Sequence, residues 1–194
     1  MPLPIHKVTA LALASILFFL FLAGHSCPLS AARGELKVYS ASAHLNGNMY
    51  YLDAQLGYDL SQAALDALDS GVPITFELEA DIVTPRKWLW DKVLLENVHR
   101  YQVVYHALTQ QYIVTNINSG IQNTYSRRNT ALLSMGRVNN LPLMEKKLLN
   151  GVEDAQLKIR VSLDIKELPA LMRPWAYINA EWLLASEWFT WEIK

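Results

Sequence analysis

The sequence is poor in cysteine and has no excess of charge of either sign. Cys27 is the only cysteine among the 194 residues, so no disulfide can form within the chain. Only one of the 17 lysines and arginines, Lys7, lies before Arg33, and all 18 acidic residues lie after Arg33. Residues 33–194 therefore carry 16 basic and 18 acidic residues, a net charge near −2. Without a basic field, the sequence does not predict binding to nucleic acid.

Motifs for metal binding or catalysis are missing as well. The segment after residue 32 has three histidines, His44, His99 and His106, and no HExxH-type motif. His99 and His106 are seven residues apart and would face opposite sides of a regular strand, so they do not predict a zinc site. No G-x-S-x-G elbow is present either. We therefore predict no catalytic residues, no metal and no cofactor.

The N-terminus is the most apolar part of the chain. After His6 and Lys7, residues 8–24 form an apolar run without a charge. A secretory signal uses about 7–15 such residues and a membrane-spanning helix about 20, and this run lies between the two. Ser30 and Ala32 stand at the −3 and −1 positions of a cleavage site before Arg33. We predict a cleaved signal peptide over residues 1–32, with a retained membrane anchor as the alternative.

Cys27 raises a second alternative, a lipoprotein in which this cysteine would be the first residue. Gly24 and His25 occupy positions where the lipoprotein motif prefers a large aliphatic and a small residue, so this alternative is disfavoured. Either main interpretation places residues 33–194 in the periplasm, free or anchored at the inner membrane, as one domain of about 162 residues.

The rest of the chain is rich in strand patterns. Residues 52–60, 74–82 and 157–165 alternate between apolar and polar side chains, which is typical of strands with one face in water. Asn46-Gly47 predicts a hairpin turn with positive φ at both positions. Further strands are expected at residues 99–108, 111–118, 121–125 and 188–193.

Short helices are expected at residues 62–70, where Ser61 can be the N-cap and Gly71 the stop, and at residues 127–135 and 142–150. Two or three short helices among many strands predict a mainly β fold, an antiparallel β-sandwich with the helices at its ends.

Charged residues follow the outward faces of two predicted strands. Glu77, Glu79 and Asp81 share one face of the first, and Lys158 and Arg160 share one face of the second. Paired carboxylates can serve glycoside hydrolysis, but a solvated face explains this spacing better. If the two strands are neighbours, cross-strand charge pairs should follow.

Tryptophan is the most distinctive residue type, and all six tryptophans lie after residue 87. Arg86, Lys87, Trp88 and Trp90 form a basic and aromatic segment after a strand, the combination favoured in partner-binding or membrane-interface patches. The alternative, which the sequence favours, is that the large aromatics fill the core and cover its open ends.

Several segments together resemble the bacterial envelope family catalogued as domain of unknown function 4390. They are, in order, the leader, the hairpin at Leu45-Asn46-Gly47, Ala67-Leu68…Gly71-Val72-Pro73, Arg86…Trp88-Leu89-Trp90-Asp91, Tyr105-His106-Ala107-Leu108-Thr109 with Tyr112, Leu168-Pro169, and Trp182…Ser186-Glu187-Trp188. The resemblance implies an envelope or signalling context, because similar proteins are encoded beside an rRNA methyltransferase and a membrane sensor kinase of the nitrogen-regulation type. It implies no catalytic residues.

Three hypotheses for the function remain. The first is a non-enzymatic interaction module that binds an envelope or membrane protein, with membrane contact through residues 8–24. The second is a periplasmic binding protein for an apolar or aromatic ligand, which requires an enclosed pocket with few polar groups. The third is an envelope hydrolase, which requires a histidine beside a carboxylate in a cleft.

Overall fold

The computed structural model describes residues 34–193. The predicted signal or anchor, the cleavage site before Arg33 and the lipoprotein alternative at Cys27 lie outside these residues. Within them, no helix is both long enough and apolar enough to cross a membrane.

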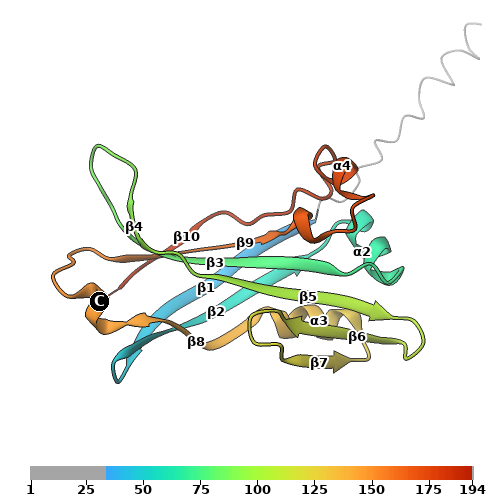
Figure 1. The fold of residues 1–194 in the computed structure, drawn as a ribbon, viewed down its shortest axis with the longest axis horizontal. Coiled ribbons are helices and arrows are strands. Elements are labelled where there is room, and N and C mark those ends of the chain that lie inside the picture. Colours follow the sequence, from blue (N-terminus) through green and yellow to red (C-terminus); the bar gives the residue numbers. More distant parts are fainter. Residues whose placement is uncertain (1–33, 194) are drawn as a thin grey trace, which may run out of the picture. The chain divides into compact units, whose positions relative to one another are not determined.

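The fold is mainly β with two antiparallel sheets, as predicted, and it has three short helices (Figure 1). The smaller sheet has the order β1 (Glu35–Asn46), β2 (Met49–Asp59), β8 (Arg137–Glu145). The larger, seven-stranded sheet has the order β10 (Phe189–Glu192), β9 (Gln156–Leu163), β3 (Ile74–Thr84), β5 (Val98–His106), β6 (Gln111–Asn116), β7 (Gln122–Tyr125), with β4 (Lys92–Leu95) paired to β3. The helices are α2 (Gln62–Asp69), α3 (Arg128–Met135) and α4 (Arg173–Ala176), with 3₁₀ turns η1 (Lys146–Leu149) and η2 (Ile165–Glu167).

The alternation of β3 and β9 explains which face of the larger sheet is buried. The two strands are antiparallel neighbours, with Leu78 opposite Val161 and Ala80 opposite Ile159, and all four side chains are buried. The residues between them carry the charges on the opposite face. A strand with this pattern can bury only one face, so the alternation fixes which side of the sheet meets the core.

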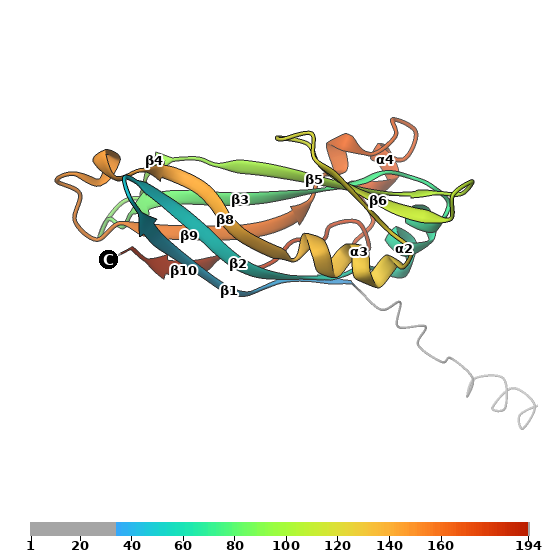
Figure 2. The same cartoon turned by 90° about the horizontal axis from the view of Figure 1, so that it is seen from below.

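Two apolar clusters form the core. One lies between the two sheets, which Figure 2 shows as two layers. It contains Leu52 of β2, Val138 of β8, and Leu78 and Ile82 of β3. The other contains the buried faces of α2 and α3 and the segment after β9, including Leu68, Leu132, Leu168 and Trp182. Helix α3 contacts strands of both sheets, so it joins them and is not confined to one end of the structure.

The hairpin prediction is confirmed, but the turn is shifted by one residue. Asn46 pairs with Met49, which makes Gly47 and Asn48 the two central positions. Gly47 has φ of 60°, whereas Asn48 is not among the residues with positive φ. Positive φ at the first position alone is the pattern of a type II′ turn, which requires glycine there and accepts asparagine next.

The first predicted helix is confirmed with its cap. The hydroxyl of Ser61 accepts a hydrogen bond from the backbone N–H of Ala64 at 3.2 Å, at the start of α2. Gly71 follows the helix with φ of 84°, a conformation that glycine adopts without strain.

The prediction of a helix over residues 142–150 is wrong. Strand β8 continues to Glu145, and only the short turn η1 follows. The reason is tertiary: β8 pairs with β2, which places Leu143 and Met144 in the core between the sheets. Pro142 is tolerated because β8 is an edge strand of the smaller sheet. The short elements β4 and α4 were not predicted from the sequence.

Candidate functional site

The basic and aromatic segment predicted from the sequence forms the connection between β3 and β4, residues 85–91, called here the tryptophan loop. Trp88 and Trp90 are 95% and 85% exposed, and Leu89 between them is 70% exposed. Figure 1 shows this loop extending beyond the end of the larger sheet. The interpretation of Trp88 and Trp90 as core residues is therefore wrong. The predicted patch did not include Leu89, although its position between two tryptophans indicated that it would share their exposure.

The base of the tryptophan loop is held by the sheet on both sides. Thr84 pairs with Lys92 where the loop begins and ends. The Lys158 ammonium on β9 donates a hydrogen bond to the carboxylate of Asp91, the last loop residue. This hydrogen bond from Lys158 holds the pKa of Asp91 below its usual range. The exposed tryptophans are thus carried on a loop with fixed ends.

A surface hollow of ≈ 500 Å³ lies at the base of the loop. Its lining includes Arg86 and Lys87 from the loop, Asp154 from the turn before β9, and Glu192 from β10. Charges of both signs at one hollow suit a polar or peptide partner. They do not suit the apolar or aromatic ligand of the second hypothesis, which requires a wall with few polar groups.

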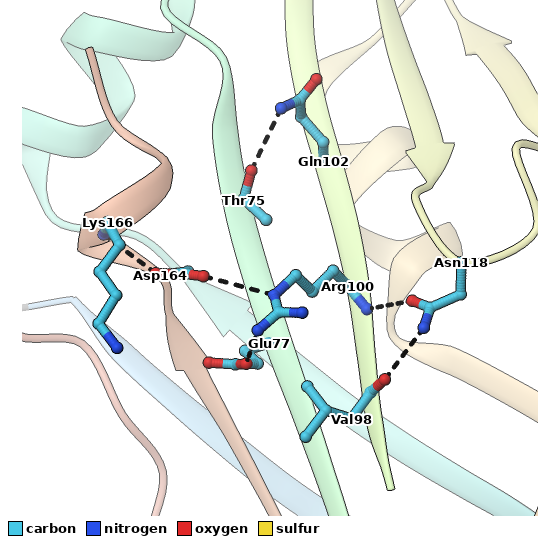
Figure 3. Close-up of polar contacts among 8 residues, drawn as sticks. All are labelled: Thr75, Glu77, Val98, Arg100, Gln102, Asn118, Asp164 and Lys166. Carbon is cyan, nitrogen blue, oxygen red and sulfur yellow. Dashed lines mark hydrogen bonds and ion pairs between the residues drawn. The ribbon is translucent and has the colours of Figure 1, made fainter. Parts of the chain in front are cut away.

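Arg100 organises the outer face of the larger sheet (Figure 3). Its guanidinium donates to Glu77 at 2.5 Å and lies 3.5 Å from the carboxylate of Asp164, which is almost fully buried. Asp164 also accepts the backbone N–H of Lys166 at 3.0 Å, where η2 begins. The network therefore fixes η2 against the sheet, a structural role.

A second set of bonds in Figure 3 continues this network across the sheet. Asn118, in the turn between β6 and β7, accepts the backbone N–H of Arg100 at 2.7 Å and donates to the carbonyl of Val98 at 3.0 Å. Gln102 donates to the hydroxyl of Thr75 at 3.2 Å on the neighbouring strand. These polar groups are satisfied by each other, which leaves them little capacity to bind a ligand.

The two charged strands are neighbours, as predicted, but their charged side chains do not form the expected ion pairs with each other. Glu79 lies opposite Arg160 and Asp81 opposite Lys158. Lys158 instead reaches Asp91, and the Arg160 guanidinium lies 5.6 Å from the centre of the Trp188 ring, a cation–π geometry. Partial burial raises the pKa of Glu79 and of Asp81. This face is therefore less solvated than the sequence suggested.

The histidines do not come together, and one of them meets a carboxylate. His44 Nδ1 lies 3.0 Å from Asp53 Oδ2, and both side chains are well exposed. His106 contacts the Thr109 hydroxyl at 3.3 Å, and burial lowers the pKa of His99. Within residues 34–193, no serine, threonine or cysteine side chain hydrogen-bonds to the His44 ring, and no group of three His, Cys, Asp or Glu is arranged to hold a metal ion.

The other four tryptophans are divided between core and surface. Trp182 is only 4% exposed and packs with α2, as the core interpretation predicted. Trp175 is 63% exposed, and Trp188 and Trp191 are 42% exposed each. Sequence alone did not separate these cases. Trp182 and Trp188 each follow a glutamate and precede an apolar residue, yet only Trp182 is buried.

Comparison with known families gives one result. The family described as "Domain of unknown function (DUF4390)" matches residues 33–192. The comparisons with curated proteins and with solved structures give no match. Because the family match spans nearly all of the chain after residue 32, as the sequence resemblance indicated, the chain belongs to the DUF4390 family.

Proposed function

We propose that residues 33–194 are a non-enzymatic interaction module of the bacterial cell envelope. In this proposal the domain is exported to the periplasm, free or anchored at the inner membrane, and binds an envelope or membrane protein. The binding surface is the tryptophan loop together with the charged hollow at its base. An accessory role in envelope signalling is a narrower form of the same proposal, in which the partner is a membrane sensor protein.

The observation that carries the proposal is the exposure of Trp88 and Trp90 on a loop with fixed ends. A tryptophan side chain that becomes buried removes roughly 150–250 Å² of surface from water, and tryptophan and arginine dominate the binding energy of protein interfaces. A loop whose ends are held by β3, β4 and the Lys158–Asp91 pair loses less conformational entropy on binding than a free one.

The charges around the loop add a requirement on the partner. Arg86 and Lys87 directly precede Trp88, and they line the hollow together with Asp154 and Glu192. A partner that places an aromatic or aliphatic side chain against Trp88 and a charged group in the hollow would satisfy both features. Association through such charges weakens as salt is added.

The experiment is photo-crosslinking from the loop in living cells. A photoreactive amino acid at Leu89, in the full chain, should form a discrete product with one envelope protein, which mass spectrometry identifies. The affinity of that purified protein is then measured for the wild type, for Trp88→Ala/Trp90→Ala and for Arg86→Ala. The tryptophan double variant should bind at least about tenfold more weakly, or about 1.4 kcal/mol.

The matched control is Leu108→Ala, an equally exposed apolar residue in the turn between β5 and β6. This variant should bind like the wild type, and all variants should keep the wild-type unfolding midpoint because the altered side chains are exposed. Equal affinity of the tryptophan double variant and the wild type would remove the loop from the binding surface and with it the basis of the proposal.

The two other hypotheses have no observation of this kind. The ligand-binding hypothesis requires an apolar enclosure. The hollow beside the loop is lined by charged groups, and a second hollow of ≈ 310 Å³, lined by Tyr39, Tyr58 and Leu132 among others, is open to solvent and not enclosed. The hydrolase hypothesis finds a histidine–carboxylate pair at His44 and Asp53, but a nucleophile that the imidazole could activate is not hydrogen-bonded to it in the described part of the chain.

A further inference from the structure

A second exposed apolar surface lies at the other end of the domain, on the helical turns around α4. Residues 169–178 are joined by helical hydrogen bonds, among them those from Ala176 to Met172 and from Ile178 to Trp175. Leu171, Trp175 and Ile178 are spaced by four and three residues, the spacing that places side chains on one side of helical turns. They are 96%, 63% and 74% exposed. This set of three is called here the α4 surface.

The same turns are also apolar on their inner side. Leu168 and Ala176 are buried, and Met172 packs beside them against the cluster that contains α2. A surface helix normally has one apolar side and one polar side, and a helix that is apolar all round is covered on both. The inner side of these turns packs against other residues of the domain. The α4 surface is not covered by any other part of residues 34–193.

The α4 surface lies beside the point where the described chain begins. Gly34 packs so closely on Leu60 and Ser61 that a Cβ atom at residue 34 would overlap their backbone. The hydroxyl of Ser61 in turn donates to the carbonyl of Glu181 at 2.7 Å, in the segment that follows α4. Residues 25–33 separate Gly34 from the apolar run at residues 8–24, and nine residues span at most about 30 Å.

The amino-acid composition of residues 168–180 favours one kind of binding partner for the α4 surface. From Leu168 to Ala180 the only charged residue is Arg173, and its Nε is already bonded to the carbonyl of Leu168 at 2.7 Å. Tyr177, beside the α4 surface, is also half-exposed. Tryptophan and tyrosine favour the boundary between lipid headgroups and acyl chains, and leucine and isoleucine favour the acyl chains below it.

We infer that the α4 surface lies on a lipid bilayer. Leu171 and Ile178 enter the acyl boundary and Trp175 lies at headgroup level. Figures 1 and 2 show α4 and the tryptophan loop at opposite ends of the domain, so bilayer contact at α4 directs the tryptophan loop away from the membrane. This inference concerns a different surface from the proposed function and does not rest on it.

The test uses the full chain, synthesised without cells in the presence of liposomes of phosphatidylethanolamine and phosphatidylglycerol. Its intact mass shows that residues 1–33 are still attached. Lipids brominated on the acyl chains quench the fluorescence of tryptophans that touch them. All six tryptophans follow residue 87, so the apolar run contributes no signal to this measurement.

Brominated liposomes should quench the wild type, and Trp175→Phe should lose more than half of the quenched signal. The matched control is Trp90→Phe, which removes one tryptophan from the other end and should keep the quenched signal. Ile178→Ser and Leu171→Ser should each lower the quenching in chains that retain all tryptophans, and thermal unfolding shows that these variants are folded.

Undiminished quenching in Trp175→Phe would overturn the inference. A loss of quenching in Trp90→Phe would also overturn it, because the tryptophan loop would then be the part that touches the bilayer. Absence of quenching in the wild type would be equally decisive against it. If the wild type then forms dimers that Ile178→Ser dissociates, the α4 surface is covered by a second copy of the chain.

Discussion

The Ser61 hydroxyl joins helix α2 to a segment 120 residues later, because it donates a hydrogen bond to the carbonyl of Glu181 at 2.7 Å. The same oxygen accepts the N–H of Ala64 at 3.2 Å and caps α2. Ser61 is fully buried, so neither bond can be replaced by water without opening the structure. One side chain therefore fixes both the start of α2 and the position of the C-terminal segment.

Replacing Ser61 with alanine should remove both bonds. The lost helix cap costs about 0.5–2 kcal/mol and the lost hydrogen bond to the partly buried carbonyl of Glu181 about 0.5–1.5 kcal/mol, so the free energy of unfolding should fall by roughly 1–3 kcal/mol. Urea unfolding of the domain measures this loss. Ser70→Ala, which removes an exposed hydroxyl bonded to Asp66 at the other end of α2, should cost less than about 0.5 kcal/mol. Equal losses in the two variants would contradict a special role for Ser61.

Replacing Arg100 with methionine should destabilise the larger sheet. The change leaves the nearly buried carboxylate of Asp164 without its cation and Glu77 without its partner. Because the arginine itself is partly exposed, we expect a loss of about 1–3 kcal/mol, below the usual cost for a fully buried pair. The comparison is Lys147→Met, which breaks an exposed pair with Glu145 and should cost under about 1 kcal/mol. Unfolding midpoints in urea that shift equally would refute the structural role assigned to Arg100.

Local sequence patterns predicted the strands well because each strand exposes one face and buries the other. The alternation in β3 and β9 indicated both their conformation and their charged face, and their register then placed Glu79 opposite Arg160. The pattern could not predict which partner each charge selects. Lys158 bonds to Asp91 because the tryptophan loop brings that carboxylate over β9, an arrangement that local periodicity does not encode.

The same limit explains the two main errors. Residues 142–150 have helical character locally, but pairing with β2 buries Leu143 and Met144 as part of a strand. Trp88 and Trp90 resemble core residues by type, and only the position of the loop beyond the sheet shows that they are exposed. Hydrophobicity predicts that a side chain benefits from burial, but it does not say whether its own domain or a partner supplies the cover.

Gly136→Ala should destabilise the domain for a steric reason alone. Gly136 follows α3 with φ of −72°, which alanine adopts freely, but a Cβ atom there would overlap the backbone carbonyl oxygen of Leu56 on β2. Relieving that overlap requires α3 and β2 to separate slightly, at a cost of about 1–3 kcal/mol. The free energy of unfolding measured in urea should fall by this amount. Leu133→Ala, at an exposed position of the same helix, should stay within about 0.5 kcal/mol of the wild type. A similar loss in the two variants would contradict the close approach of Gly136 to Leu56.

His99→Gln should remove part of the acid sensitivity of the fold. Burial lowers the pKa of His99, which lies on β5 opposite Leu78 and so faces the core side of the larger sheet. The unfolded chain binds a proton near pH 6.5, whereas the folded chain binds it only at lower pH. The stability associated with neutral His99 is therefore present above about pH 6.5 and is lost as the pH falls through the folded-state pKa.

Free energies of unfolding between about pH 7.5 and 5.5 should fall less steeply for His99→Gln than for the wild type. Glu79 and Asp81, whose pKa values are raised by partial burial, are common to both proteins, so their contributions cancel in the difference. The matched control is His106→Gln, which removes an exposed imidazole at the end of the same strand. Parallel curves for the wild type and His99→Gln would show that burial of His99 does not couple folding to protonation.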